Sequence, residues 1–344
     1  MNDINVLGMD IAKSIFHFVG INAHGKTVYK KYCRRAQVLE VLSNLSVTTI
    51  ALESCGGSHY WYRELNKLGH DVKLIAAQYV KGFNLGGRQK NDYNDARNIA
   101  QAASCADTPT VPAKNEEQQY IQSLLRHRDS SVKERTKVSN QLRALLLEYG
   151  ETIDRGHAAA RRALQTYLEP ESTAISGQVK QLLQRLQMKL DFIKEDIDYY
   201  EKELKALEAN NEKAQRIKKV PGVGLLTTMA IIANLGQPQC FKNGRHYAAY
   251  LGLVPRQFSS GGKPVLGRIS KQGDDYIRQL LIHGARSIVS SSHKRDDKLS
   301  IKLQNMLLRM PFNKVCVALA NRNARVLWSM LANRQEYKGL VSKL

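Results

Sequence analysis

Cysteine is scarce in this chain of 344 residues, which contains five. The five are widely scattered and none forms a CxxC pair, which argues against a disulfide framework and a zinc ribbon. Long apolar runs are also missing, because no stretch approaches the roughly 18 consecutive apolar residues that a membrane span needs. The opening MNDINVLGMD lacks a basic segment followed by an apolar one, so it does not resemble a secretory signal. We expect a soluble cytoplasmic protein without a membrane partner.

Acidic side chains are few in the last third of the chain. Overall, 52 Lys and Arg stand against 31 Asp and Glu, a net charge of +21. Residues 220–344 hold 19 basic and 5 acidic side chains, or +14, whereas residues 1–110 and 111–219 hold +4 and +3. This concentration is typical of a surface that neutralises nucleic-acid phosphates. The alternative is a basic surface that serves solubility or meets ribosomes or acidic lipid.

The first hundred residues alternate between strand and helix patterns. Three antiparallel strands are predicted first, at residues 4–11, 14–23 and 26–33. A helix, a buried strand, a second helix and a last strand follow at residues 36–45, 46–54, 58–69 and 71–77. This order of elements predicts a ribonuclease-H-like α/β core.

From residue 117 onward the pattern becomes helical. Residues 117–149 predict one long helix, whose basic face includes Arg126, Arg128, Lys133, Arg135, Lys137 and Arg143. The first four of these are expected to contact nucleic acid. Apolar residues then recur in alternating steps of four and three, at Val179, Leu183, Leu186, Leu190, Ile193, Ile197, Tyr200, Leu204 and Leu207. This spacing predicts a coiled coil, which either folds back on the 117–149 helix or pairs with a second subunit. A plain amphipathic helix on its own domain is the remaining interpretation.

Four carboxylates stand where the predicted sheet would gather them. Asp10 ends the first strand and Glu53 ends the 46–54 strand, and these strands are neighbours in a sheet of this order. Asp92 and Asp95 share one face at the start of a predicted helix. Oxygen-only ligands favour Mg²⁺, with Mn²⁺ as the alternative ion, often as a pair that holds a phosphate. Otherwise, Asp92 or Asp95 caps the helix and Glu53 is a surface residue.

Two glycine-containing segments stand out in the basic third, residues 217–344, which otherwise reads as mostly helical. Gly222 and Gly224 lie in a turn between predicted helices, where backbone N–H groups can face a DNA phosphate. A tight corner without a ligand explains them equally well. Ser260 lies in a Gly-, Ser- and Pro-rich insert at 252–273, in which residues 259–262 are predicted as a flexible loop between helical segments. The cations near it are Arg256, Lys263, Arg268 and Lys271. By themselves, these residues predict a phosphate-binding loop or a linker.

The segments GMDIAK, ALESCGGSHYW and GRQKNDYNDARNIAQ resemble the DEDD transposases of bacterial insertion sequences, whose first domain is similar to the Holliday-junction resolvase RuvC. The resemblance implies that Asp10, Glu53, Asp92 and Asp95 are the metal-binding acids. GLVP followed by a double serine resembles the GLxP…SG element of the family's second domain. It implies that Ser260 is the nucleophile, with Ser259 the weaker candidate, in a composite site with the acids.

These observations together predict a DNA transposase or recombinase. Mg²⁺ at the acid cluster would position the DNA, and Ser260 would attack a backbone phosphate through a phosphoserine intermediate. The resemblance also implies a structured non-coding guide RNA that chooses donor and target DNA. We expect a homodimer or homotetramer that works at the nucleoid. The predicted domains are a RuvC-like domain (1–110), long helices with the coiled coil (111–216) and a basic serine-containing domain (217–344).

Three other functions compete with this prediction. In a metal-dependent junction nuclease, water would attack and Ser260 would be structural. A phosphotransferase of the sugar-kinase and actin type shares the early strand order, but it needs glycine-rich phosphate loops and a duplicated half, which this sequence lacks. A non-catalytic RNA-binding scaffold is disfavoured by the intact set of four acids.

Overall fold

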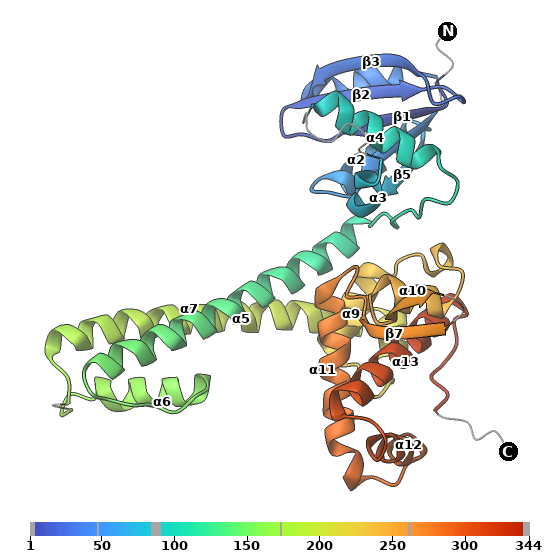
Figure 1. Ribbon diagram of the computed structural model, residues 1–344. Coiled ribbons are helices and arrows are strands. Elements are labelled where there is room, and N and C mark those ends of the chain that lie inside the picture. Colours follow the sequence, from blue (N-terminus) through green and yellow to red (C-terminus); the bar gives the residue numbers. More distant parts are fainter. Residues whose placement is uncertain (1–3, 47, 84–90, 173, 261–262, 340–344) are drawn as a thin grey trace. The chain divides into compact units, whose positions relative to one another are not determined.

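The computed structural model describes residues 4–46, 48–83, 91–172, 174–260 and 263–339. It divides into two compact units, Met1–Glu116 and Glu117–Leu344. The first unit is a mixed α/β unit, and the second is mainly helical (Figure 1). The chain is therefore an α/β unit followed by a helical region, as the sequence predicts.

A five-stranded sheet forms the centre of the first unit (Figure 1). Its strands are β1 (Val6–Asp10), β2 (Ile15–Ile21), β3 (Thr27–Arg34), β4 (Thr49–Glu53) and β5 (Asp71–Ile75), in the order β3-β2-β1-β4-β5. The first three are antiparallel neighbours, whereas β4 runs parallel to β1 and β5 runs parallel to β4. The predicted succession of strands and helices is confirmed, and β1 and β4 are neighbours.

Helices cover both faces of this sheet, because its strands carry apolar side chains on both sides. Helices α1 (Val38–Ser43) and α2 (Ser58–Lys67) pack on the face that holds Leu7 and Met9. Helices α3 (Ala77–Lys81) and α4 (Asp92–Ser104) pack on the face that holds Val6 and Ala51. Since side chains alternate along a strand, Asp10 and Glu53 belong to the face covered by α4. A 3₁₀ turn, Arg35–Gln37, precedes α1.

Three helices form the start of the second unit: α5 (Glu116–Glu148), α6 (His157–Leu168) and α7 (Gly177–Ala209). The heptad residues of α7 lie against α5 and α6 within the same chain, where Val179, Leu183, Leu190, Ile193 and Ile197 share a buried cluster with Val138, Leu142 and Leu164. The described part of α7 thus buries these heptad residues within its own chain, whereas the predicted coiled coil stays a prediction. Figure 1 shows α5 crossing α7 at an angle.

The basic third packs around one large apolar core. Its helices are α8 (Glu212–Ile217), α9 (Leu225–Asn234), α10 (Gly244–Tyr250), α11 (Asp275–Ser291), α12 (Lys298–Leu307) and α13 (Phe312–Ala332), with 3₁₀ turns at Pro238–Cys240 and Ser292–Lys294. Helix α13 contacts both α10 and α11, and its buried residues include Leu319, Leu327 and Met330. None of the helices in the described ranges is long and apolar enough to cross a membrane.

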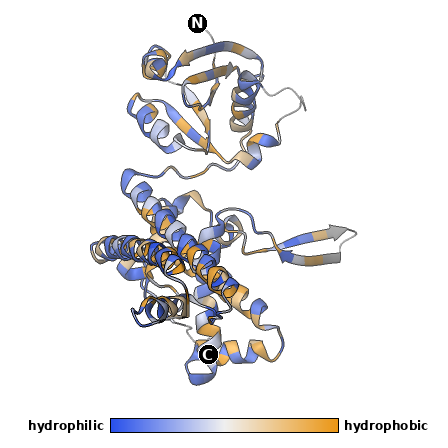
Figure 2. Ribbon diagram, turned by 90° about the vertical axis from the view of Figure 1, so that its left-hand side faces the viewer, coloured by the Kyte–Doolittle hydropathy of each residue, from blue (hydrophilic) through white to orange (hydrophobic). Residues whose placement is uncertain are grey.

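The insert at 252–273 has strands where the sequence suggested helical segments on either side of a loop at 259–262. It contains two antiparallel strands, β6 (Pro255–Ser260) and β7 (Lys263–Ile269), with Ser260 opposite Lys263. The Gly-Gly pair between two short runs that contain Phe258 and Val265 is a hairpin signal, and the serine-rich composition hid it. Figure 2 shows the two strands extending away from the helices of their unit. Ser260 therefore belongs to a strand end.

Candidate active site

Asp10 stands at the C-terminal end of β1, between two neighbouring strands. Antiparallel pairing places it opposite His17 of β2. On its other side, the parallel ladder aligns Met9 with Leu52, so the next residues, Asp10 and Glu53, end their strands together. The expectation that these two carboxylates reach the same sheet edge agrees with this register.

Helix α4 brings two more carboxylates to this edge. The Asn91 side chain caps the helix by accepting a hydrogen bond from the Tyr93 backbone N–H at 3.0 Å. Asp92 and Asp95 lie in the first turn of the helix and leave the cap to Asn91. The alternative in which either aspartate serves as the cap therefore does not apply. Residues 87–90, the GRQK part of the motif, lie outside the described residues.

Three of the four predicted acids meet directly. Asp10, Asp92 and Asp95 each offer a carboxylate oxygen, and these oxygens all lie within 4.8 Å of one another. Glu53 lies outside this group of three, but its charge still raises the pKa of Asp10. The structure thus places one tight cluster of aspartates with a fourth acid beside it.

Burial and neighbouring charges together disfavour the ionised form of Asp10. Burial, followed by the charges of Asp95 and Asp92, raises the pKa of Asp10 from 3.8 to about 6. The nearby His17 acts in the opposite direction. Like-charged carboxylates that share a site disfavour each other's ionisation, and a bound cation removes this penalty. The cluster therefore has the electrostatics of a cation site.

His17 is a residue of this site that the sequence analysis missed. Its Nδ1 atom lies 3.6 Å from Oδ2 of Asp92, and its ring meets that of Tyr93 edge-on, with the centroids 4.8 Å apart. The Nδ1 atom is buried without a hydrogen-bond partner among the described residues. The short connection between Asp10 and Ile15 sets the register of the hairpin, in which His17 lies opposite Asp10. This short connection is the sequence signal that could have identified His17.

The donor set of the cluster fits a divalent metal ion. It supplies carboxylate oxygens from β1 and α4, which is the ligand chemistry that Mg²⁺ and Mn²⁺ prefer over softer metals. Burial and the neighbouring charges of Asp95 and Asp92 raise the pKa of Asp10, and a positive counter-charge would offset both effects. Asp10, Asp92 and Asp95 are therefore the residues that would hold such an ion, and Glu53 stands next to them.

Several cations predicted to bind nucleic acid have partners inside the protein. Arg126 lies 3.6 Å from Oδ2 of Asp274 and stacks over the Tyr276 ring. Arg128 donates from Nε and Nη2 to Oε1 of Glu201, at 2.9 and 2.8 Å. These contacts join α5 to other helices of the second unit and account for both arginines without a ligand.

The other residues predicted to contact nucleic acid, on α5 and in the glycine turn, differ in how exposed they are. Lys133 is exposed and pairs with Asp129 at 2.7 Å on the same helix, and Arg135 is half-buried. Gly222 has a φ of +83° and packs against Gly284 of α11, whose carbonyl oxygen would lie 2.8 Å from an added Cβ. Packing alone therefore explains Gly222, whereas Gly224 is exposed. Their contacts with DNA remain predictions.

The cations of the β6–β7 hairpin are more accessible. Arg256 is exposed and donates from Nη2 to the Ser270 carbonyl at 3.3 Å. Arg268 and Lys271 are also exposed. The side chains of Ser260 and Lys263 lie outside the described residues, so the structure gives only their backbone positions in β6 and β7.

Comparison with known proteins gives the family of this chain. A model for DEDD transposases of the IS110 type matches residues 7–151, and a model for the transposase IS116/IS110/IS902 family matches residues 214–300. The chain is 41% identical, over 98% of its length and 92% of the relative's, to the transposase for insertion sequence element IS1111A of Coxiella burnetii. It is 36% identical to the transposase for IS1328 of Yersinia enterocolitica, over 95% of this chain and 97% of the relative.

A more distant relative is the pilin gene-inverting protein of Moraxella bovis, which is 22% identical over 74% of this chain and 73% of its own. The matched models and the identities above 30% over nearly the whole chain agree with each other. The chain is an insertion-sequence transposase and belongs to the IS116/IS110/IS902 family. The resemblance drawn from the sequence motifs is confirmed.

Proposed function

We propose that this transposase cuts and rejoins DNA strands with a divalent-metal site formed by Asp10, Asp92 and Asp95, with Glu53 as the fourth acid. The observation that carries the proposal is the convergence of the three aspartates within 4.8 Å. The strand order of the first unit, with β1 at its centre, supports a ribonuclease-H/RuvC-like fold for this unit. Mg²⁺ is the proposed ion, and Mn²⁺ is its closest substitute.

Each part of the site has its own task in this proposal. The aspartates hold the ion, and Glu53 adds negative charge at the same sheet edge. A bound divalent ion polarises a phosphoryl oxygen and neutralises charge that develops on it. His17 would position Asp92 through the 3.6 Å contact, and its ring packs edge-on against that of Tyr93.

We further propose that Ser260 is the nucleophile of strand cleavage. Its hydroxyl oxygen would bond to phosphorus while the bond from phosphorus to one bridging oxygen breaks, and the freed strand end would take up the proton. Rejoining is the reverse reaction with a new strand end. A relative that is named as a gene-inverting protein supports rejoining, because inversion of a DNA segment requires both steps. The exposed Arg256 and Arg268 of the hairpin would hold the scissile phosphate.

The partners and the division of the chain follow from the same proposal. Donor and target DNA would be selected by a structured non-coding RNA, in a homodimer or homotetramer that works at the nucleoid. Residues 1–110 would act as the metal domain, 111–216 as the helical connection and 217–344 as the serine-containing domain. The +14 charge of the last part supports nucleic-acid contacts there.

A metal-dependent nuclease is the second candidate. The observation that favours it is that all four acids belong to the first unit, whereas Ser260 belongs to the second. Attack by water would need only the first unit's residues. In that case Ser260 would have only a structural role, at the end of β6.

Denaturing electrophoresis separates these two candidates. The full chain is mixed with labelled DNA that contains an element end, in the presence and absence of Mg²⁺. A covalent protein–DNA adduct that Ser260→Ala abolishes and Ser259→Ala retains supports the serine proposal. Free cleaved ends that persist in Ser260→Ala identify the nuclease instead. If Asp10→Asn and Asp92→Asn both keep full activity, the metal site is not the reaction centre.

A further inference from the structure

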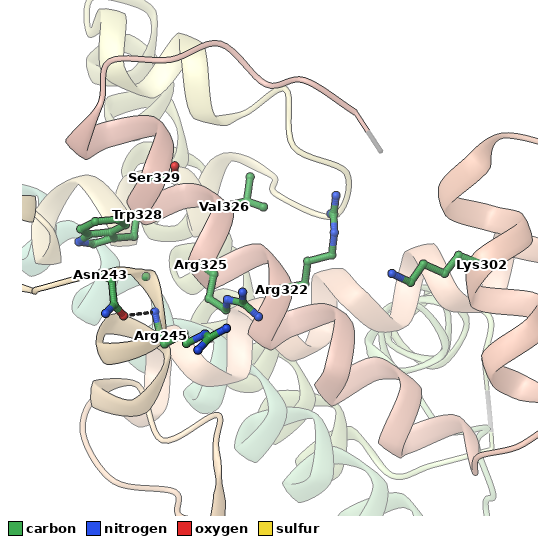
Figure 3. A pocket seen from close by; sticks show the side chains of 9 residues that line it. Asn243, Arg245, Lys302, Arg322, Arg325, Val326, Trp328 and Ser329 are labelled. Carbon is green, nitrogen blue, oxygen red and sulfur yellow. Dashed lines mark hydrogen bonds between the residues drawn. The ribbon is translucent and has the colours of Figure 1, made fainter. Parts of the chain in front are cut away.

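A cavity of about 670 Å³ lies in the second unit, between α10, α12 and α13. Four cations line it: Arg245 of α10, Lys302 of α12, and Arg322 and Arg325 of α13. Its remaining lining is polar or apolar and includes Asn243, Trp328 and no acidic residue. Figure 3 shows Arg245 and Arg325 side by side and Lys302 extending from α12 toward α13. This cationic cavity is one that the sequence analysis did not anticipate.

The four cations lack the internal partners that other basic residues have. In the part of the chain that the structure describes, the charged groups of these four side chains form no ion pair and no hydrogen bond. Arg322 is half-buried, and its Nη1 atom is buried without an acceptor. A buried charged donor without a partner costs free energy, and an anion bound to this guanidinium would remove the cost.

The wall of the cavity is held in place by contacts that do not involve the cations' charged groups. The Asn243 side chain accepts hydrogen bonds from the backbone N–H groups of Arg245 and His246, at 2.9 and 3.1 Å. Gly244 lets this segment approach α13 so closely that an added Cβ would lie 2.9 Å from the Arg325 carbonyl oxygen. Trp328 donates from Nε1 to the Pro238 carbonyl at 2.9 Å. The arrangement is therefore preorganised rather than a chance grouping of mobile side chains.

We propose that this cavity binds a phosphodiester of a nucleic-acid strand. Arginine forks match the geometry of phosphate oxygens, and three arginines with one lysine line this cavity without an acid to neutralise them. The volume lies within the range of about 300–1,000 Å³ that is usual for small-ligand pockets, so it accommodates a phosphate with its sugar or base. The Trp328 ring gives that segment an apolar wall. The site goes beyond strand cleavage, because none of its residues belongs to the acid cluster or the serine hairpin.

Fluorescence anisotropy with the full chain tests this site. The probes are a labelled DNA duplex and a labelled single-stranded RNA of unrelated sequence, both in EDTA, so that cleavage plays no part. The test variant is Arg322→Gln/Arg325→Gln. The matched control is Arg309→Gln/Lys314→Gln, which removes two exposed cations from the α12–α13 junction outside the cavity.

We expect the test variant to bind at least about tenfold more weakly and to lower the slope of log affinity against log salt by about 1, whereas the control changes affinity less than about threefold. The charge-preserving Arg322→Lys/Arg325→Lys should recover the salt slope but only part of the affinity. A loss confined to DNA or to RNA also supports the site and identifies which strand it holds. Equal losses in the test and control variants, or no loss in the test variant, overturn it.

Two further measurements keep the outcome decisive. If the melting temperature of Arg322→Gln/Arg325→Gln falls, Arg245→Gln/Lys302→Gln replaces it, because these two side chains are exposed. Inorganic phosphate is titrated in a thermal melt of the wild type and the test variant. Stabilisation by phosphate that the variant loses, combined with unchanged nucleic-acid binding, identifies a free-phosphate site and overturns the proposal. Failure of strand cleavage leaves these binding results unaffected, so the two proposals fail separately.

Discussion

An added Cβ on Gly8 would lie 2.0 Å from the carbonyl oxygen of Ala96, so the backbones of β1 and α4 are in direct contact at this point. Gly8 stands two residues before Asp10, and Ala96 directly follows Asp95. The contact therefore sets how closely the helix start approaches the strand end. The acid cluster depends on a residue that has no side chain.

Gly8→Ala is expected to separate the acids. The methyl group forces α4 away from β1, which should cost about 1–3 kcal/mol of unfolding free energy and abolish metal-dependent activity. Urea unfolding and the cleavage assay measure both effects. Gly82→Ala is the control in the same unit, because its added Cβ meets only an ordinary contact at 3.4 Å. Full activity in Gly8→Ala would show that the cluster tolerates a shift of α4.

Asp10 should make stability depend on pH in the absence of metal. Its pKa is raised from 3.8 to about 6, so between these values the folded state binds more protons than the unfolded state. The free energy of unfolding should therefore fall as the pH rises from about 4 to about 6 and then level off. Asp10→Asn should flatten this dependence in melts recorded with EDTA.

The exposed Asp107 supplies the control for this experiment, since Asp107→Asn should keep the wild-type pH profile. Adding Mg²⁺ at neutral pH should raise the melting temperature of the wild type more than that of Asp10→Asn, because only the folded wild type offers the full ligand set. Equal shifts in both proteins would place the ion elsewhere.

Leu190 should stabilise the helical part of the second unit from within the chain. It is 3% exposed in the cluster formed by α5, α6 and α7. Leu190→Ala should cost about 2–5 kcal/mol in urea unfolding without changing the oligomer size by light scattering. On the same helix, Leu182 is 53% exposed, and Leu182→Ala should change stability by less than about 0.5 kcal/mol. A smaller oligomer in Leu190→Ala would instead favour pairing of the heptad face with a second subunit.

Arg128 should contribute to folding rather than to nucleic-acid binding. Its bonds to Glu201 join α5 to α7 in a half-buried position. Arg128→Gln should lower the unfolding free energy by about 1–3 kcal/mol and leave DNA affinity nearly unchanged. Lys133→Gln, which breaks an exposed pair within one helix, should cost less than about 0.5 kcal/mol. Weaker DNA binding in Arg128→Gln with an unchanged urea midpoint would reverse this assignment.

Local patterns in the sequence were sufficient to predict most of the helices and strands. The period-2 alternation of residues 14–23 and the heptads from Val179 to Leu207 are read from neighbouring residues, and β2 and α7 lie where these patterns place them. The hairpin β6–β7 was missed because its composition favours a loop and its pairing joins two short strands. The family motifs predicted the four acids as metal ligands, and the parallel pairing of β1 with β4 agrees with the edge expected for Asp10 and Glu53.

Tertiary structure decided what no local pattern contains. The distance between Asp10 and Asp95 depends on the backbone contact at Gly8, and the place of His17 depends on the hairpin register. Whether Arg128 or Arg322 is free to bind a phosphate depends on which acids lie near it, and the sequence shows both only as basic residues. The spacing of apolar residues indicates only which face of a single helix or strand is buried. The neighbours of a side chain are set by packing between elements that are distant in the sequence, so only the folded chain determines them.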